Sequence, residues 1–195
     1  MINYFSRLLD TITESVTSMD ETVFRQLVDE CAGVLERGNK IIVSGLGKNV
    51  PVCEKFVGTM NSLGQNAVFM NTNSAVHGDL GMVKQDDLVI ILTKSGETVE
   101  SIYLTQLLKQ RNVDLWLLSF RPESTLTHEI PKQLILHLEH EGDLWDIVPN
   151  NSTTINLIVL QGVAIELAKR RGVTLQDFRQ NHPGGFIGAY LNQLS

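Results

Sequence analysis

Short apolar runs alternate along this chain with longer segments of helical periodicity, and this alternation most constrains the fold. The clearest run, DLVIILT at 87–93, is apolar on both faces of an extended strand. Strands buried on both faces are typical of parallel sheets, in which a helix carries the chain back between strands. The sequence therefore predicts right-handed strand–helix–strand units, a parallel sheet, and helices on both of its faces.

Five strands and several helices are expected from periodicity. The strands are predicted at 40–45, 67–70, 87–93, 113–120 and 133–138. Helices are predicted within 4–16 and 23–35, and over 51–63, 99–111 and 152–171. We expect one α/β domain over residues 1–195, a three-layer αβα sandwich around a five-stranded parallel sheet. Residues 1–38 are expected to form helices that pack on this domain or on a partner subunit.

Charge and composition exclude several classes of protein. The net charge is −6, whereas general nucleic-acid binders carry a basic face. No run of about 18 apolar residues occurs, so no membrane span is expected. The start of the chain has no continuous apolar core, so it is not a signal peptide. Cys31 and Cys53 are not spaced as zinc ligands, and free buried thiols in a reducing cytoplasm are expected.

The first polar cluster, SGLGKN, directly follows the first predicted strand. Gly45 and Gly47 would let the backbone approach a ligand, and Lys48 adds a positive charge beside the N–H groups of the next helix. The stretch is neither a Walker A loop nor a GxGxxG fingerprint. An anion site and a plain strand-to-helix turn are therefore equally good interpretations of this cluster alone.

The second cluster, KSGETVE, follows the clearest strand. Ser95 could cap the next helix, with Glu97 in its first turn to interact with the helix dipole. This interpretation leaves Lys94, Thr98 and Glu100 unexplained. A ligand site is the alternative.

Two further clusters lie towards the end of the chain. PNNSTT opens the helix predicted at 152–171 with three hydroxyl side chains, which exceeds what capping requires and fits a phosphate or sugar contact. NHPGGFIG places His182 before a proline and three glycines, although a lone histidine is more often structural. HGDLGM offers His77 and Asp79 to a metal, but two ligands do not make a site, and no metal is expected.

Five motifs in a fixed order along the chain resemble the sugar isomerase (SIS) domain family. They are GLGKN, HGDLGM, KSGETVE, PNNSTT and NHPGGFIG. The likeness covers about residues 20–190 and is strongest to the arabinose-5-phosphate isomerases. It implies a flavodoxin-like SIS fold and the aldose–ketose isomerisation of a sugar phosphate through an enediol, without an organic cofactor. The expected reaction converts D-arabinose 5-phosphate to D-ribulose 5-phosphate. The family also implies a homodimer or homotetramer with active sites shared between subunits.

The resemblance assigns roles to particular residues. The implied catalytic residues are Lys48, Glu100, Glu141 and His182. The implied substrate-binding residues are Ser44, Gly45, Gly47, Asn49, His77, Ser95, Gly96, Thr98, Ser152, Thr153 and Thr154. Isomerisation needs a base that moves a carbon-bound proton, and the carboxylate of either glutamate can be that base. His182 would open the ring or move an O–H proton, and Lys48 would stabilise the enediolate.

Several positions depart from the family pattern and leave the sugar open. Lys94 stands where the family usually has asparagine, and Asn49 where it often has serine. Residues 142–148 also differ. Many arabinose-5-phosphate isomerases continue into paired CBS domains, so a chain that ends at Ser195 is expected to be a stand-alone SIS domain. Two alternatives remain: an SIS isomerase acting on another sugar, such as a hexulose phosphate, and a non-catalytic sugar-phosphate sensor.

Overall fold

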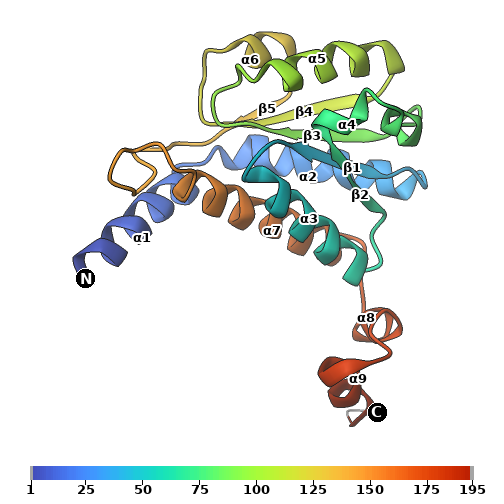
Figure 1. The fold of residues 1–195 in the computed structure, drawn as a ribbon. Helices are drawn as coiled ribbons and strands as arrows, with labels where there is room; N and C mark the ends of the chain where they lie inside the picture. Colours follow the sequence, from blue (N-terminus) through green and yellow to red (C-terminus); the bar gives the residue numbers. More distant parts are fainter. Residues whose placement is uncertain (1, 194–195) are drawn as a thin grey trace.

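The computed structural model describes residues 2–193, which form a parallel sheet between two layers of helices (Figure 1). The strands are β1 (Ile41–Gly45), β2 (Ala67–Asn71), β3 (Leu88–Leu92), β4 (Asp114–Ser119) and β5 (Gln133–Ile135). Their order in the sheet is β2-β1-β3-β4-β5, and every pairing is parallel. The expected α/β fold with a five-stranded parallel sheet is therefore confirmed.

Two helical layers cover the sheet (Figure 1). One layer contains α2 (Glu21–Glu36), α3 (Asn49–Ser62) and α7 (Asn151–Arg170), with α1 (Ile2–Thr17) packed on α7. The other contains α4 (Thr72–Ala75), α5 (Val99–Leu108) and α6 (Thr125–Glu129), and the short 3-10 helices are η1 (Asp79–Met82) and η2 (Lys109–Arg111). After α7 the chain continues into α8 (Leu175–Gln180) and α9 (Gly185–Gln193), which extend away from the sheet.

The strands bury both faces because successive side chains alternate between the two layers. In β3, Ile90 and Leu92 belong to the cluster that includes α2, α3 and α7, whereas Val89 and Ile91 belong to the cluster that includes α5. All four side chains are buried. Full burial of such a side chain contributes about 1.5–3 kcal/mol, so the central strands hold both layers in place.

The strand order creates a crevice at the carboxyl ends of β1 and β3. From β1 the chain passes through α3 to β2, on one side of β1, and then crosses to β3 on the other side. Because α3 and α5 leave β1 and β3 into opposite layers, the two loops separate at this point. Ligands in open α/β sheets bind at such a switch in strand order.

Some boundaries differ from those expected. β5 ends at Ile135 rather than at residue 138, because its neighbour β4 ends at Ser119, directly opposite Ile135. The helix predicted at 99–111 divides into α5 and η2, and Asn112 then adopts a left-handed conformation with φ of 48°. Helices α4, α6, α8 and α9 were not predicted, because each has fewer than ten residues and too little periodicity to detect.

Both cysteines are free and buried, as expected. Burial raises the pKa of the Cys53 thiol to about 12, and it raises that of Cys31 further. Both thiols are therefore neutral packing groups at ordinary pH. Within residues 2–193, none of the helices has the length and hydrophobicity needed to cross a bilayer.

Candidate active site

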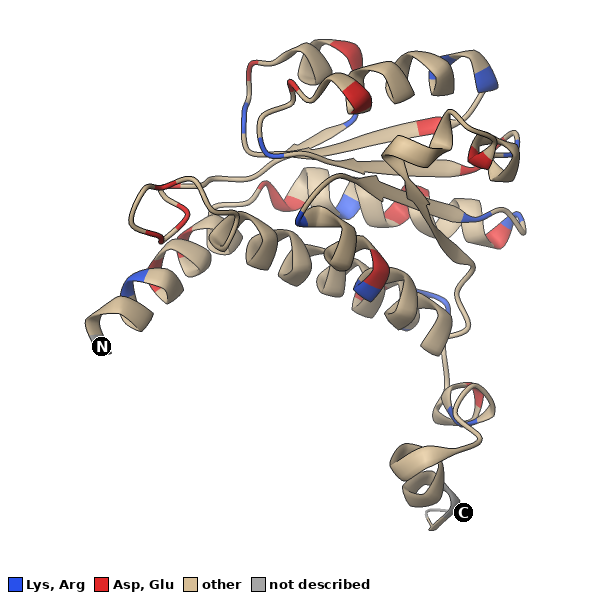
Figure 2. Cartoon of the chain, in the orientation of Figure 1, with Lys and Arg blue, Asp and Glu red and all other residues tan. Residues whose placement is uncertain are grey.

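A cavity of about 240 Å³ lies at the carboxyl ends of β1 and β3. Its walls come from the loop after β1, the loop after β3 and the N-terminal turn of α7. The lining residues are Leu46, Gly47, Lys48, Asn49, Leu92, Thr93, Lys94, Ser95, Thr98, Ser101, Pro149, Ser152 and Thr153. Two of these residues are charged, and both are lysines, one after each strand. In Figure 2 the ribbon is blue at the start of α3 and in the loop that follows β3. The cavity is therefore a positive site in an acidic chain.

The loop after β1 approaches the cavity through its backbone. A Cβ atom on Gly45 would lie 2.9 Å from the Cβ of Asn49 and 3.3 Å from the sulfur of Cys53, so no side chain fits there. Gly47 has a φ of 57°, which turns the chain along the cavity wall. Ser44 is buried, and its hydroxyl lies 2.8 Å from that of Thr72 on α4. The structure therefore does not bring Ser44 to the cavity.

Lys48 and Asn49 lie where α3 begins, and both line the cavity. Lys48 is exposed and makes no capping hydrogen bond with its side chain. The side-chain oxygen of Asn49 accepts a 3.1 Å hydrogen bond from Asn156, which is buried on α7. This contact ties the first loop to the helix on the other side of the cavity.

The loop after β3 places Ser95 and Thr98 on the cavity wall. The Ser95 hydroxyl accepts a 3.2 Å hydrogen bond from the backbone of Glu97, and Thr98 occupies the N-cap position of α5 without a capping side-chain bond. The role expected for Glu97 in the first turn of this helix is wrong. Its carboxylate accepts hydrogen bonds of 2.8 and 2.7 Å from the backbone and hydroxyl of Thr125, at the start of α6. These bonds lower the pKa of Glu97.

Gly96 does not line the cavity but fixes the shape of this loop. Its φ is 70°, and a Cβ atom there would lie 2.0 Å from the hydroxyl oxygen of Ser124. That hydroxyl accepts from the backbone N–H of Thr127 and so caps α6. Only glycine therefore allows the loop after β3 to pack against the start of α6.

Replacing Gly96 by alanine is expected to lower the free energy of unfolding by about 3 kcal/mol, from strained backbone and the clash with Ser124. Gly38→Ala is the matched control, because Gly38 has a φ of 82° but open space around its Cβ position. It is expected to cost roughly 1 kcal/mol, from backbone strain alone. Urea unfolding of both variants measures the difference, and equal losses would show that the contact with Ser124 is unimportant.

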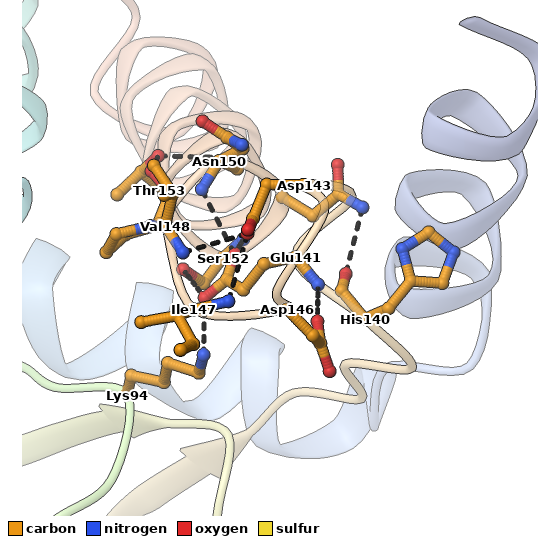
Figure 3. A network of polar contacts seen from close by, with 12 residues as sticks. Lys94, His140, Glu141, Asp143, Asp146, Ile147, Val148, Asn150, Ser152 and Thr153 are labelled. Atoms are coloured by element: carbon orange, nitrogen blue, oxygen red, sulfur yellow. Dashed lines mark hydrogen bonds and ion pairs between the residues drawn. The ribbon is translucent and has the colours of Figure 1, made fainter. Parts of the chain in front are cut away.

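The third wall is the start of α7, which is capped by a distant residue. Asn150 occupies the N-cap position but makes no capping hydrogen bond with its side chain. Instead, Oε2 of Glu141 accepts from the backbone N–H groups of Asn150 (3.1 Å) and Ser152 (2.9 Å) (Figure 3). Oε1 accepts from the Ser152 hydroxyl at 2.7 Å and lies 2.8 Å from Nζ of Lys94. Glu141 is fully buried.

The segment 142–148 is folded around two aspartates. The Asp143 carboxylate accepts backbone hydrogen bonds of 2.8–3.0 Å from Trp145, Ile147 and Val148. Desolvation acts to raise the pKa of Asp143, but these bonds outweigh it and lower the pKa. Asp146 accepts a hydrogen bond from the backbone of Glu141 (Figure 3). The segment that departs from the family pattern therefore holds Glu141 in place.

Besides Ser44, Gly45, Gly96 and Glu141, four further predicted site residues lie outside the cavity lining. Glu100 is exposed in the first turn of α5, and His77 is exposed between α4 and η1. Thr154 is exposed and its hydroxyl donates to the carbonyl of Asn150 at 2.9 Å. His182 lies between α8 and α9, beyond the far end of α7, where its ring stacks on that of Phe178 with 4.0 Å between centroids.

Sequence reasoning missed several residues of the site. Thr93, Ser101 and Pro149 also line the cavity. Thr93 was the one with a visible signal, because it is the polar residue that ends the clearest strand. No group of three or more metal-ligating side chains occurs in the described part of the chain.

Comparisons with known proteins find relatives that match over most of this chain. Arabinose 5-phosphate isomerase KdsD of Escherichia coli (strain K12) is 33% identical over 178 residues, which cover 91% of this chain and 54% of the relative. KdsD of Pseudomonas aeruginosa is 32% identical over 190 residues, or 97% of this chain and 58% of the relative. The chain thus spans about half the length of these curated relatives.

A solved structure matches over nearly the full length of both chains. It is the c3406 protein of E. coli CFT073 in complex with a phosphosugar, with a TM-score of 0.84, 30% identity, and coverage of 92% of this chain and 94% of that chain. The SIS domain model matches residues 35–171, which is more than half of the sequence. The chain belongs to the SIS domain family.

Proposed function

We propose that this protein is a sugar-phosphate aldose–ketose isomerase that converts D-arabinose 5-phosphate to D-ribulose 5-phosphate. The observation that carries the proposal is the cavity at β1 and β3, which combines two lysines with hydroxyl side chains and has the carboxylate of Glu141 directly behind Lys94. The similarity to KdsD supports the same reaction.

The phosphate group is proposed to occupy the positive cavity. The two lysines of the lining make this cavity positive, and the hydroxyls of Ser95 and Thr98 lie at the start of α5, where helix N–H groups also favour an anion. Ser152 and Thr153 form the opposite wall. Holding the phosphate fixes the rest of the sugar relative to the catalytic groups.

The proton transfer is assigned to Glu141. Two of its contacts, Lys94 and Ser152, line the cavity, whereas Glu100 is absent from the lining. A carboxylate takes the proton from C2 of the open-chain aldose, and the electrons of the broken C–H bond form the C1–C2 double bond of the enediolate. Oxygen O1 gains a proton and O2 loses one, and the first proton returns to C1 to give the ketose. Lys48 stabilises the developing negative charge.

His182 is assigned to ring opening in the site of a neighbouring subunit. It lies on the α8–α9 segment, which continues beyond the end of α7 (Figure 1), whereas the cavity of its own chain lies at the start of α7. This segment exposes large apolar side chains, including Phe186, Ile187 and Tyr190. A homodimer or homotetramer would cover these side chains and bring His182 to another subunit's cavity.

Deuterium exchange tests this function. The protein is incubated in deuterated water with a panel of aldose and ketose phosphates that includes D-arabinose 5-phosphate and a hexulose 6-phosphate. Exchange at the carbon beside the carbonyl is expected with D-arabinose 5-phosphate. Exchange with another sugar alone would change the substrate but keep the reaction class. Binding without exchange on any sugar would contradict isomerisation.

One observation favours a second function, that of a sugar-phosphate sensor. The cavity has no carboxylate in its lining, as far as the described residues show, since Glu141 is fully buried and Glu100 lies elsewhere. A sensor needs only the lysines and hydroxyls, so it would bind a sugar phosphate and leave its carbon-bound protons in place. The deuterium experiment separates the two functions directly.

A further inference from the structure

Lys94 connects the cavity with the buried carboxylate of Glu141. Its side chain lines the cavity and is 38% exposed, while its Nζ lies 2.8 Å from Oε1 of a glutamate that is 0% exposed. Figure 3 shows the lysine reaching this carboxylate from the opposite side to the start of α7. Lys94 therefore separates Glu141 from whatever occupies the cavity.

The four donors to Glu141 differ in their freedom to move. Both donors to Oε2 are backbone N–H groups at the start of α7, and the Ser152 hydroxyl is attached to the same turn. Lys94 is the exception among them, because its ammonium group sits on a flexible four-carbon chain that is partly in solvent. Unlike the two backbone N–H groups, it can leave without unfolding the helix, and it is the donor that carries a full charge.

We infer that Lys94 is a positioning residue that couples phosphate binding to Glu141. A phosphate in the cavity draws the Lys94 ammonium away from Oε1, and this oxygen is then free to accept the proton of the substrate. The inference rests on the proposed function for its catalytic consequence. The exchange of partners itself is a property of the cavity and can be measured without turnover.

Movement of Lys94 from Glu141 to the phosphate leaves neither charged group without partners. The ammonium leaves one carboxylate and gains a phosphate, which carries more charge and more acceptor oxygens. The carboxylate keeps its three donors from the α7 turn, where the helix dipole also favours a negative charge. Glu141 is therefore not left as an isolated buried charge when Lys94 departs.

Titration calorimetry with inorganic phosphate tests this coupling at fixed ionic strength. Lys94→Met is expected to weaken phosphate binding about tenfold, because the variant loses one charge-assisted hydrogen bond to the phosphate. Glu141→Gln is expected to strengthen it roughly threefold or more, because the lysine no longer has a competing partner. In the Lys94→Met background, this strengthening should be lost. Removal of the carboxylate charge alone would strengthen phosphate binding in both backgrounds, so the dependence on Lys94 is the result that identifies the coupling.

Lys48→Met serves as the matched control. Lys48 lines the same cavity but has no contact with Glu141 among the described ion pairs and hydrogen bonds. Its loss should weaken phosphate binding, and Glu141→Gln should still strengthen binding in that background. Thermal melting of each variant verifies that the fold is retained.

Two results would overturn the inference. One is an unchanged or lower phosphate affinity in Glu141→Gln while Lys94 is present, and the other is an absence of phosphate binding by the wild-type protein. Failure of the proposed function has a different signature, which is the lack of deuterium exchange on every sugar while the phosphate coupling remains intact.

Discussion

Glu141→Gln is expected to reduce turnover of the sugar phosphate about 10³-fold, within the range for loss of a general base. The protein should remain folded, because the amide oxygen can still accept from the backbone N–H groups of Asn150 and Ser152. Lys94 loses its partner but is partly exposed and can turn towards solvent. Steady-state kinetics together with phosphate titration should show lost turnover with strengthened phosphate binding.

Glu141→Leu is the contrasting variant and tests the structural side of the same residue. Leucine leaves the two N–H groups and the hydroxyl of Ser152 without an acceptor at the start of α7. It also removes the partner of Lys94, so a loss of about 3–5 kcal/mol in the free energy of unfolding is expected. Glu100→Gln should retain most of the activity. If Glu100→Gln abolishes turnover and Glu141→Gln does not, the two glutamates have been assigned the wrong way round.

Much of the fold follows from the strands alone. Runs such as 88–92 must be buried on both faces, and this requirement imposes parallel pairing and two helical layers. The short helices α4 and α6 could not be predicted in the same way. Their stability comes from local caps, such as the Asn71 side chain that accepts from two backbone N–H groups at the start of α4, and not from a long apolar stripe.

The candidate site was predictable where it depends on topology. Loops that follow neighbouring parallel strands meet at one edge of the sheet, so Lys48, Ser95 and Thr98 were expected to come together, and they line one cavity. Ser44 shows how the alternation of side chains along a strand refines such a prediction. It lies two residues after Ile42 and so faces the same layer, that of α4 and α5, rather than the cavity.

The contacts of Glu141 could not be read from the sequence. The partners of its carboxylate lie 9 to 47 positions away, and segment 142–148, folded by backbone hydrogen bonds to Asp143, carries the chain from Glu141 to the start of α7. Lys94, in contrast, can be singled out from the sequence, because it departs from the family pattern. Its role could be interpreted only once the position of the Glu141 carboxylate was known. A residue that breaks a motif is best interpreted by what it contacts.

Mixing two inactive variants is expected to restore activity if His182 serves a neighbouring subunit. His182→Gln should be about 10²-fold or more less active, since it removes an acid–base group, and Glu141→Gln is inactive for another reason. In mixed oligomers, a cavity from a His182→Gln chain can receive the intact histidine of a Glu141→Gln chain. Random assembly makes about a quarter of the sites complete, so activity should rise far above that of either variant.

The matched control combines Glu141→Gln with Lys48→Met. Lys48 lines the cavity of its own chain, and Glu141 contacts that same cavity through Lys94, so no mixture of these two variants makes a complete site. The His182 pair should recover activity after co-refolding and this pair should not. Recovery in neither mixture would contradict the assignment of His182 to a neighbouring subunit's cavity. In that case the contacts of His182 would be purely structural and would organise the α8–α9 segment. Its ring stacks on that of Phe178, and its Nδ1 lies 2.8 Å from the carbonyl oxygen of the same residue.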